Sequence, residues 1–451
     1  MRLRMLAILT CLAVVAAACG NSKQDTATNT TTAQGGPTAT TASAAELKQN
    51  VPVTAKGVTN DSISVDVIAS KNNPLHGHYA EIADGMQAYF NMVNSEGGIY
   101  GRQLKIGKQR DDTIGLQNLQ QAQQALATDN AFATFIATLQ FGGAQALQNA
   151  GQPTFGWNIN SEYGDKNALF GNESALCNGA SCTGITGSWL AKKAGATKIG
   201  VLAYGVNQSS IDCGKGTLNS FAKYDAAKVV FHDFSIQFAQ PDLSAQVAQM
   251  KNKGVQMVFT CMDADETLVL AKEMKRQGLN AIQELPNGYD RNFIKANAQY
   301  YEGSYVIPQF LALEWKPQIP EIKTFEKWIK AENKPTYEIT VIGWIAAYQF
   351  VLGLKLAGPH FTQQKVIDGL NTQTDVTVGG LISPINWKDT GHVDPVKHPE
   401  VRSHTECSNF LKIHDGTFVP VFATAAKPWV CIPNSSTHVP DNPPTRTYVN
   451  G

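Results

Sequence analysis

From residue 61 onward, short apolar runs and segments with helical spacing of apolar residues follow one another in turn. The run 61–70 (DSISVDVIAS) predicts a strand, and residues 79–94 predict a helix because their apolar side chains recur every three or four positions. Regular alternation of this kind requires parallel sheets covered by helices on both faces, so the sequence predicts an α/β fold. The other predicted elements in this part are strands 103–107, 132–138, 153–157, 198–204, 228–234, 255–260 and one before Pro286, and helices 115–128, 183–194, 215–224, 243–252 and 266–277.

The pattern changes in the last third of the chain. Residues 304–309 predict a strand that returns to the first part of the fold, and residues 320–331 and 338–357 predict helices. The second of these helices is apolar on nearly all sides, which indicates a buried position within a lobe or between lobes. Residues 376–433 contain short strand-like pieces, such as 410–413 and 418–422, which we expect to close the second lobe.

A chain of 451 residues is longer than a single hydrophobic core usually supports. Its two successive sets of strand and helix units predict two doubly wound parallel-sheet lobes, with crossings between them near residues 180, 308 and 385. We therefore expect residues 58–180 and 308–385 in lobe 1, and residues 181–307 and 386–433 in lobe 2. The end, residues 434–451, is rich in proline, asparagine and threonine and is expected to be disordered.

The N-terminus has the pattern of an export signal. Arg2 and Arg4 precede a run of apolar residues that is too short to cross a membrane, so residues 1–18 predict a signal peptide. Small residues before Cys19 resemble the lipobox of bacterial lipoproteins, which implies a lipidated Cys19 and an anchor in the membrane. That motif more often has leucine at the position of Ala16, so ordinary cleavage after Ala18 is the alternative. Residues 19–57 have the composition of a flexible linker.

The charge and the cysteine content of the chain limit which partners, metals and disulfides are expected. Lysine plus arginine and aspartate plus glutamate number 37 each, which gives no electrostatic reason to expect nucleic acid. An exported chain with six cysteines beyond Cys11 and Cys19 is expected to form disulfides. Zinc is the competing interpretation, but no pair has the short Cys-x-x-Cys spacing of a zinc knuckle, and we expect no metal. The expected disulfides are Cys177–Cys182, which encloses a tight loop, Cys213–Cys261, which joins the ends of neighbouring strands, and Cys407–Cys431, which flanks two short strands.

Several motifs follow one another in a family-specific order. The loop 73–77 (NPLHG) precedes the first helix, residues 97–104 (GGIYGRQL) follow it, and the next strand ends in Asp111 and Asp112. Over residues 59–385 this order resembles the type I periplasmic binding proteins, the branched-chain amino-acid-binding family of ABC transport. The resemblance implies two lobes joined by a three-crossover hinge, a small-molecule ligand between them, ABC permease subunits as partners, and an extracytoplasmic monomer without a cofactor.

Parallel sheets of this kind bind ligands beyond the carboxyl ends of their strands. The candidate site residues are therefore those in the loops that follow the predicted strands. They are His76, His78, Tyr79, Thr138, Gln140, Phe141, Gly142, Trp157, Asn158, Tyr204, Asn207, Asp212, Asp263, Asn287 and Tyr289.

Each kind of candidate has a structural alternative. Phe141 and Trp157 either enclose a ligand or cap the core of lobe 1. His76 and His78 either contact a ligand or a metal or lie in a solvated loop. Asp212 and Asp263 contact a ligand or act as helix-capping and loop acids.

The sequence departs from the amino-acid-binding members of the family where they hold the ligand. Residues 138–142 and 156–160 carry aromatic side chains in place of most of the hydroxyls that hold the ligand carboxylate there, and Asn287 stands where an acid often holds the ammonium. We therefore expect a neutral or weakly polar ligand with a planar or apolar part, and not a free α-amino acid.

Motifs of catalysis are missing from the sequence. It contains no Gly-x-Ser-x-Gly or His-Glu-x-x-His, and residues 214–217 lack the first glycine of a phosphate loop, so we expect no catalytic residues. The expected function is that of a solute-binding lipoprotein of an ABC uptake system. The alternatives are a ligand-binding sensor subunit for a membrane receptor and a secreted hydrolase.

Overall fold

A computed structural model describes residues 43, 45–75, 77–177, 181–398, 405–433 and 436–448. The expected signal peptide, Cys19 and His76 lie outside these ranges.

The first lobe is built on a parallel sheet in the order β2-β1-β3-β4-β5. Ser62 of β1 pairs with Gln103 of β2, and Val65 pairs with Ala133 of β3. Almost every residue of β1 and β3 is buried, as expected for strands covered on both faces. The strands are β1 (Ser62–Ala69), β2 (Gln103–Asp111), β3 (Ala133–Ala137), β4 (Thr154–Gly156) and β5 (Leu169–Gly171).

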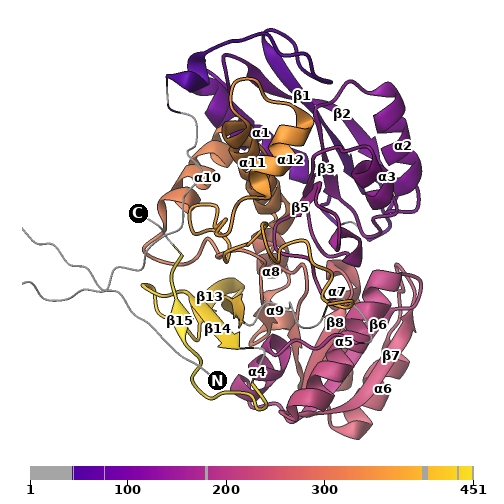
Figure 1. Cartoon of the computed structure of the whole chain (residues 1–451). Helices are drawn as coiled ribbons and strands as arrows, with labels where there is room; N and C mark the ends of the chain where they lie inside the picture. Colours follow the sequence, from indigo (N-terminus) through magenta and orange to yellow (C-terminus); the bar gives the residue numbers. More distant parts are fainter. Residues whose placement is uncertain are drawn as a thin grey trace, which may run out of the picture. The chain divides into compact units, whose positions relative to one another are not determined.

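Helices cover both faces of this sheet (Figure 1). One face carries α1 (Ile82–Ser95), α11 (Glu338–Ala357) and α12 (Gln363–Leu370), and α10 (Pro320–Ala331) packs beside α1. The other face carries α2 (Asn118–Thr128) and α3 (Ala144–Asn149), and the short helix η1 (Glu46–Lys48) precedes β1.

Helix α11 is the centre of lobe 1. The side chain of Phe350 packs against the strand residues Phe135 and Phe155, with ring centroids 5.8 and 5.6 Å apart. A methyl group on Gly85 of α1 would collide with a carbonyl of α11, so glycine lets the two helices approach closely. Within the described ranges α11 alone is long and apolar enough to span a membrane, but 78% of its apolar window is buried inside the protein, which is typical of a core helix.

The second lobe has a seven-stranded sheet in the order β13-β12-β10-β9-β8-β6-β7. Strands β6 to β10 run parallel, whereas β12 and β13 join the edge in antiparallel orientation. The strands are β6 (Lys198–Tyr204), β7 (Lys228–Ile236), β8 (Met257–Cys261), β9 (Ile282–Glu284), β10 (Tyr305–Val306), β12 (Phe410–His414) and β13 (Thr417–Val421).

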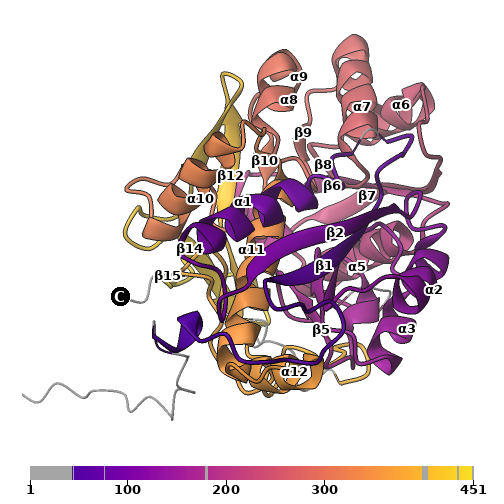
Figure 2. The same cartoon turned by 90° about the horizontal axis from the view of Figure 1, so that it is seen from above.

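The helices of lobe 2 also lie on opposite faces of their sheet, α5 on one side and α6 and α7 on the other (Figure 2). Helix α4 packs against α5. A small third sheet, β11-β14-β15, completes the C-terminal part. The remaining elements are α4 (Thr186–Lys193), α5 (Gln208–Tyr224), α6 (Ser244–Lys253), α7 (Ala264–Gln277), α8 (Arg291–Ala296), α9 (Ala298–Tyr301), η2 (Ser161–Tyr163), β11 (Thr405–Ser408), β14 (Trp429–Pro433) and β15 (Thr445–Arg446).

The predicted alternation is confirmed, and β6, α10 and α11 have the predicted bounds. The predicted return of residues 304–309 to lobe 1 is wrong, because Tyr305 and Val306 pair with β9 and β12 of the second sheet. Helix α5 begins at Gln208 and not at residue 215, and α3, β5 and α12 were not predicted.

Three segments differ from the expected division of the chain. The end of the expected linker, residues 45–57, contacts lobe 1. There the guanidinium of Arg102 donates to the carbonyl of Val51 at 2.7 Å. Residues 386–398, expected in lobe 2, also contact lobe 1, where Lys397 pairs with Asp165 at 2.7 Å. Residues 436–448 contain β15, which pairs with Trp429 and Val430, in place of a disordered end.

Candidate functional site

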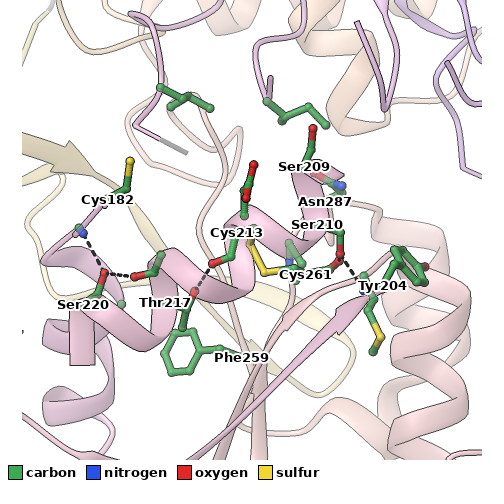
Figure 3. Close-up of a pocket in the computed structure, with 18 of the residues that line it drawn as sticks. Cys182, Tyr204, Ser209, Ser210, Cys213, Thr217, Ser220, Phe259, Cys261 and Asn287 are labelled. Atoms are coloured by element: carbon green, nitrogen blue, oxygen red, sulfur yellow. Dashed lines mark hydrogen bonds between the residues drawn. A yellow bond between two sulfur atoms is a disulfide. The ribbon is translucent and has the colours of Figure 1, made fainter. Parts of the chain in front are cut away.

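The strands of the two sheets end around a cavity of about 390 Å³ (Figure 3). Lobe 1 contributes Leu139 and Ile159, from the loops after β3 and β4. The first crossing contributes Leu176, Cys177 and Cys182, and the remaining lining residues belong to lobe 2. The cavity therefore lies mainly against lobe 2, with lobe 1 closing one side.

One face of α5 forms a long wall of this cavity (Figure 3). The helix begins where the Asn207 side chain accepts a hydrogen bond from the Ser210 backbone amide at 2.8 Å, a typical N-cap. The cavity-lining residues recur every three or four positions and have small side chains, which leave room beside the helix. They are Ser209, Ser210, Cys213, Gly216, Thr217 and Ser220, followed by Phe221, and the charged side chain of Asp212 lines the cavity beside them.

This wall was not predicted from the sequence. Its predicted helix began at residue 215, so the recurrence of small residues that starts at Ser209 was not visible. Asn207 was identified only as a possible ligand contact, although its place before the run of residues 208–214 is a helix-start signal.

Most hydroxyl groups along this wall donate to the protein backbone. Ser210 donates to the carbonyl of Cys261, Thr217 donates to the carbonyl of Cys213, and Ser220 donates to the carbonyl of Gly216. These donors are not available to a ligand. The wall thus presents mainly methylene and methyl groups to the cavity.

The end of the cavity nearest lobe 1 is polar. The Tyr79 hydroxyl of lobe 1 donates to Oδ1 of Asp263 at 2.6 Å, and the backbone amide of Asp263 donates to the hydroxyl of Tyr204 at 3.0 Å. Asn287 donates a longer hydrogen bond of 3.4 Å to Asp263, and Tyr204 donates to Glu266 at 2.6 Å. Burial raises the pKa of the Asp263 carboxyl to about 6, so it is an unusually basic acceptor.

The charged side chains that line the cavity, within the described part of the chain, are acidic. Among the described residues that line it there is no lysine, arginine or histidine, whereas Asp212 and Asp263 contribute carboxylates. The lining supplies an opposite charge to a cation but not to an anion.

Of the fifteen predicted ligand contacts, five line the cavity: Tyr204, Asn207, Asp212, Asp263 and Asn287. Asp212 accepts a hydrogen bond from the side chain of Gln208, one turn earlier in α5, at 2.9 Å. Tyr79 reaches the lining residues through its hydrogen bond to Asp263.

The two predicted aromatic contacts pack inside lobe 1. Phe141 is fully buried and packs against Tyr163, with ring centroids 5.3 Å apart. Trp157 is also fully buried, stacks under Tyr79 at 5.6 Å, and donates from Nε1 to Gln309 at 3.0 Å. Their structural interpretation, as caps on the core of lobe 1, therefore fits the geometry better than ligand contact does.

Three further candidates also have structural partners. Thr138 donates to the carbonyl of Gln140 at 3.1 Å, and the Asn158 side chain donates to two backbone carbonyls just after β5. Tyr289 is buried and donates to Glu314 at 2.7 Å. These side chains hold loops and the second crossing in place.

The remaining candidates lie apart from the cavity. Gln140 and Gly142 line a separate open groove beside the start of α5. His78 stacks on Tyr337 with ring centroids 3.6 Å apart, and its Nδ1 lies 3.4 Å from Glu81, which raises the pKa of the imidazole. The structure therefore brings together only the lobe 2 members of the predicted set.

Three disulfides form, and they match the three expected pairs. Their Cα–Cα distances are 5.4 Å for Cys177–Cys182, 6.1 Å for Cys213–Cys261 and 4.0 Å for Cys407–Cys431. The first two lie in the cavity wall.

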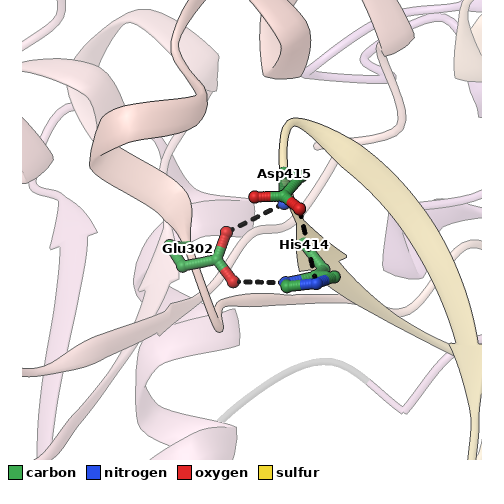
Figure 4. Close-up of side chains that lie close together, drawn as sticks. All are labelled: Glu302, His414 and Asp415. Carbon is green, nitrogen blue, oxygen red and sulfur yellow. Dashed lines mark hydrogen bonds and ion pairs between the residues drawn. The ribbon is translucent and has the colours of Figure 1, made fainter.

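A cluster of titratable side chains lies at the turn between β12 and β13 (Figure 4). Nδ1 of His414 is 2.7 Å from Glu302, its Nε2 is 3.5 Å from Asp415, and the backbone amide of Asp415 donates to Glu302 at 2.9 Å. All three side chains are exposed and pair with one another. We assign them as ion pairs that hold the turn, a contribution that is small at an exposed position.

Comparison with known proteins gives a family and a fold. A family model described as periplasmic binding protein matches residues 73–398. No curated protein sequence matches the chain.

Solved structures of similar architecture cover most of the chain. A fatty acid ABC transporter substrate-binding protein from Thermomonospora curvata is 18% identical with a TM-score of 0.64, covering 89% of this chain and 98% of that one. A solute binding protein of R. palustris in complex with benzoate is 15% identical with a TM-score of 0.62, covering 84% and 99%. A branched-chain amino acid transporter substrate binding protein from Streptococcus pneumoniae, in complex with isoleucine, is 16% identical with a TM-score of 0.63, covering 80% and 100%. At these identities the likeness confirms the predicted two-lobed α/β fold.

Proposed function

Because the chain belongs to the periplasmic binding protein family, we propose that it is the lipid-anchored, extracytoplasmic solute-binding component of an ABC uptake system. Its role is to capture a small molecule between the lobes and present it to the permease subunits. Catalysis has no part in this role.

The observation that carries the proposal is the cavity of about 390 Å³ at the ends of the strands, closed by residues of both lobes. This is the usual place for a ligand in an open α/β sheet, and the volume suits a small molecule. The hydrogen bonds that join the two lobes beside it include those from Tyr79 to Asp263 at 2.6 Å and from Ser209 to Asn160 at 3.0 Å. A hinge motion that opens the cavity must break both bonds, so a ligand that contacts both lobes shifts the equilibrium toward the closed state.

The charge of the lining argues against a free α-amino acid. A zwitterion in a dry cavity needs partners for both charges, because an unpaired buried charge costs several kcal/mol. Asp263 could pair with an ammonium group, but no basic side chain among the described lining residues is available for the carboxylate. The proposed ligand is therefore a largely apolar small molecule without an α-carboxylate.

Thermal unfolding with a panel of ligands tests this function. A ligand at about 100 times its dissociation constant adds roughly 2.7 kcal/mol to the free energy of unfolding. We expect such stabilisation from apolar alcohols or amines and none from millimolar leucine, isoleucine or valine. Stabilisation by these amino acids that is lost in Asp263→Asn would contradict the ligand assignment.

The anchor is tested separately. We expect Cys19→Ser to move the mature protein from the membrane fraction to the soluble fraction, because its acyl chains are then missing. Cys11→Ser, in the apolar run before the cleavage site, is the matched control and should leave the protein in the membrane fraction. Retention of Cys19→Ser in membranes after a high-salt wash would refute lipidation at this residue.

A further inference from the structure

The cavity extends along one helix. Its lining follows α5 from Ser209 to Phe221, which at 1.5 Å per residue is a wall of about 18 Å. The space beside α5 is therefore elongated along the helix, and we call it the channel.

The far half of this channel is apolar, whereas Asp212 contributes a carboxylate to its wall one turn after Ser209. The hydroxyls of Thr217 and Ser220 donate to carbonyls of their own helix, so their carbon atoms face the available space. At the far end, Phe221 and Phe259 pack together with ring centroids 5.2 Å apart. A chain of methylene groups is the chemical unit that fits such a lining, since it needs no hydrogen bonds.

The near end has a different chemistry. Asp263 is buried there, and no described lining residue carries a positive charge to pair with it. A ligand group placed beside Asp263 is favoured if it donates a hydrogen bond and disfavoured if it is an anion.

We propose that the ligand is a linear aliphatic molecule whose hydroxyl or ammonium head group donates to Asp263 and whose chain lies along α5 toward Phe221. This inference rests on the proposed solute-binding function and narrows its ligand. It also assigns Thr217 a role in specificity, because this residue lies two turns along the wall from Ser209 and its side chain limits the chain length that fits.

A series of linear alcohols from butanol to dodecanol, measured by isothermal titration calorimetry, tests the channel. Each methylene that enters an apolar site is expected to raise the affinity about fourfold, and the increase should stop when the channel is full. In Thr217→Trp the increase should stop at a shorter chain, so that decanol loses more than tenfold in affinity while butanol changes less than threefold.

The matched control is Lys215→Trp, which adds the same ring at an exposed position of α5 and should leave the whole series unchanged. Circular dichroism and thermal unfolding identify a variant that does not fold. In that case Gly216→Leu, on the same wall, replaces Thr217→Trp with the same expectation. Equal loss for butanol and decanol, or no loss for either, would overturn the assignment of the channel.

The head group is tested with decanol, decylamine and decanoate. We expect decanol or decylamine to bind at least tenfold more tightly than decanoate, and the alcohol and amine arms distinguish a neutral head from a cationic one. Asp263→Asn should remove most of the preference over decanoate. Tightest binding of decanoate would refute the assigned head group.

The outcome also separates this inference from the function on which it rests. If compact compounds such as cyclohexanol stabilise the protein while the linear alcohols show no dependence on chain length, the channel is wrong and the solute-binding function stands. If neither class stabilises the protein, both the channel and the proposed ligand class are refuted.

Discussion

The two lobes differ in the side chains that follow the strand ends facing the cavity. These side chains are bulky in lobe 1, whereas those of α5 in lobe 2 are mostly small. After β3 and β4, Phe141 and Trp157 are fully buried and fill the space above their sheet. After β6, the wall of α5 presents mostly serine, cysteine, glycine and threonine, together with Asp212 and, at its end, Phe221. The same position in two similar lobes is therefore used for packing in one and for an open cavity in the other.

This difference indicates that side-chain volume, and not hydrophobicity, decides where open space remains between the lobes of this structure. Aromatic residues after a strand have flat faces that suit a planar ligand, but a ring that is fully buried has no surface left for one. Small residues look uninformative in the sequence, yet on a helix face they leave the open volume.

The lobes also differ in how their cavity-facing elements are held. Lobe 1 uses contacts among aromatic rings, such as Phe155 with Phe350. In lobe 2 the hollow wall of α5 is tied to the end of β8 by the Cys213–Cys261 disulfide. The covalent bond thus stands beside the open volume, where side-chain packing is weakest.

The largest effect is expected where lobe 1 is packed. Trp157→Ala should lower the free energy of unfolding by about 3 to 5 kcal/mol, because it leaves a cavity beneath Tyr79 and removes the hydrogen bond to Gln309. Urea unfolding measures this loss. Trp328→Ala, at a partly exposed position of α10, is the matched control and should cost clearly less. A loss of ligand binding at unchanged stability would instead show that Trp157 contacts the ligand. It would contradict the conclusion that this strand end of lobe 1 serves packing alone.

The next effect concerns the disulfide of lobe 2. Cys213→Ser with Cys261→Ser opens a loop of 48 residues, and the loss of chain constraint predicts a cost of about 4 kcal/mol. The matched pair Cys177→Ser with Cys182→Ser opens a loop of only 5 residues and should cost about 2 kcal/mol. Denaturant unfolding of both double variants compares the two values. Equal costs would indicate that the disulfide does not compensate for weak packing along α5.

The sequence predicts the alternation of elements because buried strands and amphipathic helices carry strong periodic signals. Helices α10 and α11 were predicted to the residue, since both are bounded by clear signals and have strong apolar character. Helix α5 was cut short because residues 208–214 contain few apolar side chains. That part of the helix faces the cavity and not a core, so the usual signal is missing where the candidate site lies.

Other differences depend on contacts between distant parts of the chain. Strand β10 is two residues long, and its place in the second sheet follows from pairing with β12 more than one hundred residues later. Whether Trp157 lines a ligand site or a core depends on the position of Gln309 and Tyr79, which no local pattern specifies. The strand-end rule selected the right region but did not separate packing from recognition.

A moderate effect of pH is expected at the contact between the lobes. Burial raises the folded-state pKa of Asp263 to about 6 from 3.8, so the folded protein binds more protons than the unfolded chain between these values. The contribution of this group to stability is therefore fully present below pH 4 and falls as the pH rises through 6, by roughly 2 to 3 kcal/mol. Asp263→Asn should remove this part of the pH dependence in urea unfolding between pH 4 and 8.

Other buried acids titrate in a similar range, since burial raises the pKa of Glu173 and Glu284 to about 8 and that of Glu338 to about 7. The informative quantity is therefore the difference between the wild-type and Asp263→Asn curves at each pH. Parallel curves would mean that the Tyr79–Asp263 contact is formed equally well by either protonation state.

The smallest expected effect on the free energy of unfolding comes from replacing either of two serines in the cavity wall of lobe 2 by alanine. The two substitutions should change it in opposite directions. The hydroxyl of Ser188 in α4 is buried without a hydrogen-bond partner in the structure, so Ser188→Ala should raise the free energy of unfolding by about 1 kcal/mol. Ser220 is the matched control, because its hydroxyl donates to Gly216 at 2.7 Å and accepts from the Gly184 amide at 2.9 Å. Ser220→Ala should therefore lower stability by about 1 kcal/mol. If both substitutions destabilise the ligand-free protein by the same amount, Ser188 is already satisfied, by water for example, and the wall near α4 is wetter than its lining suggests.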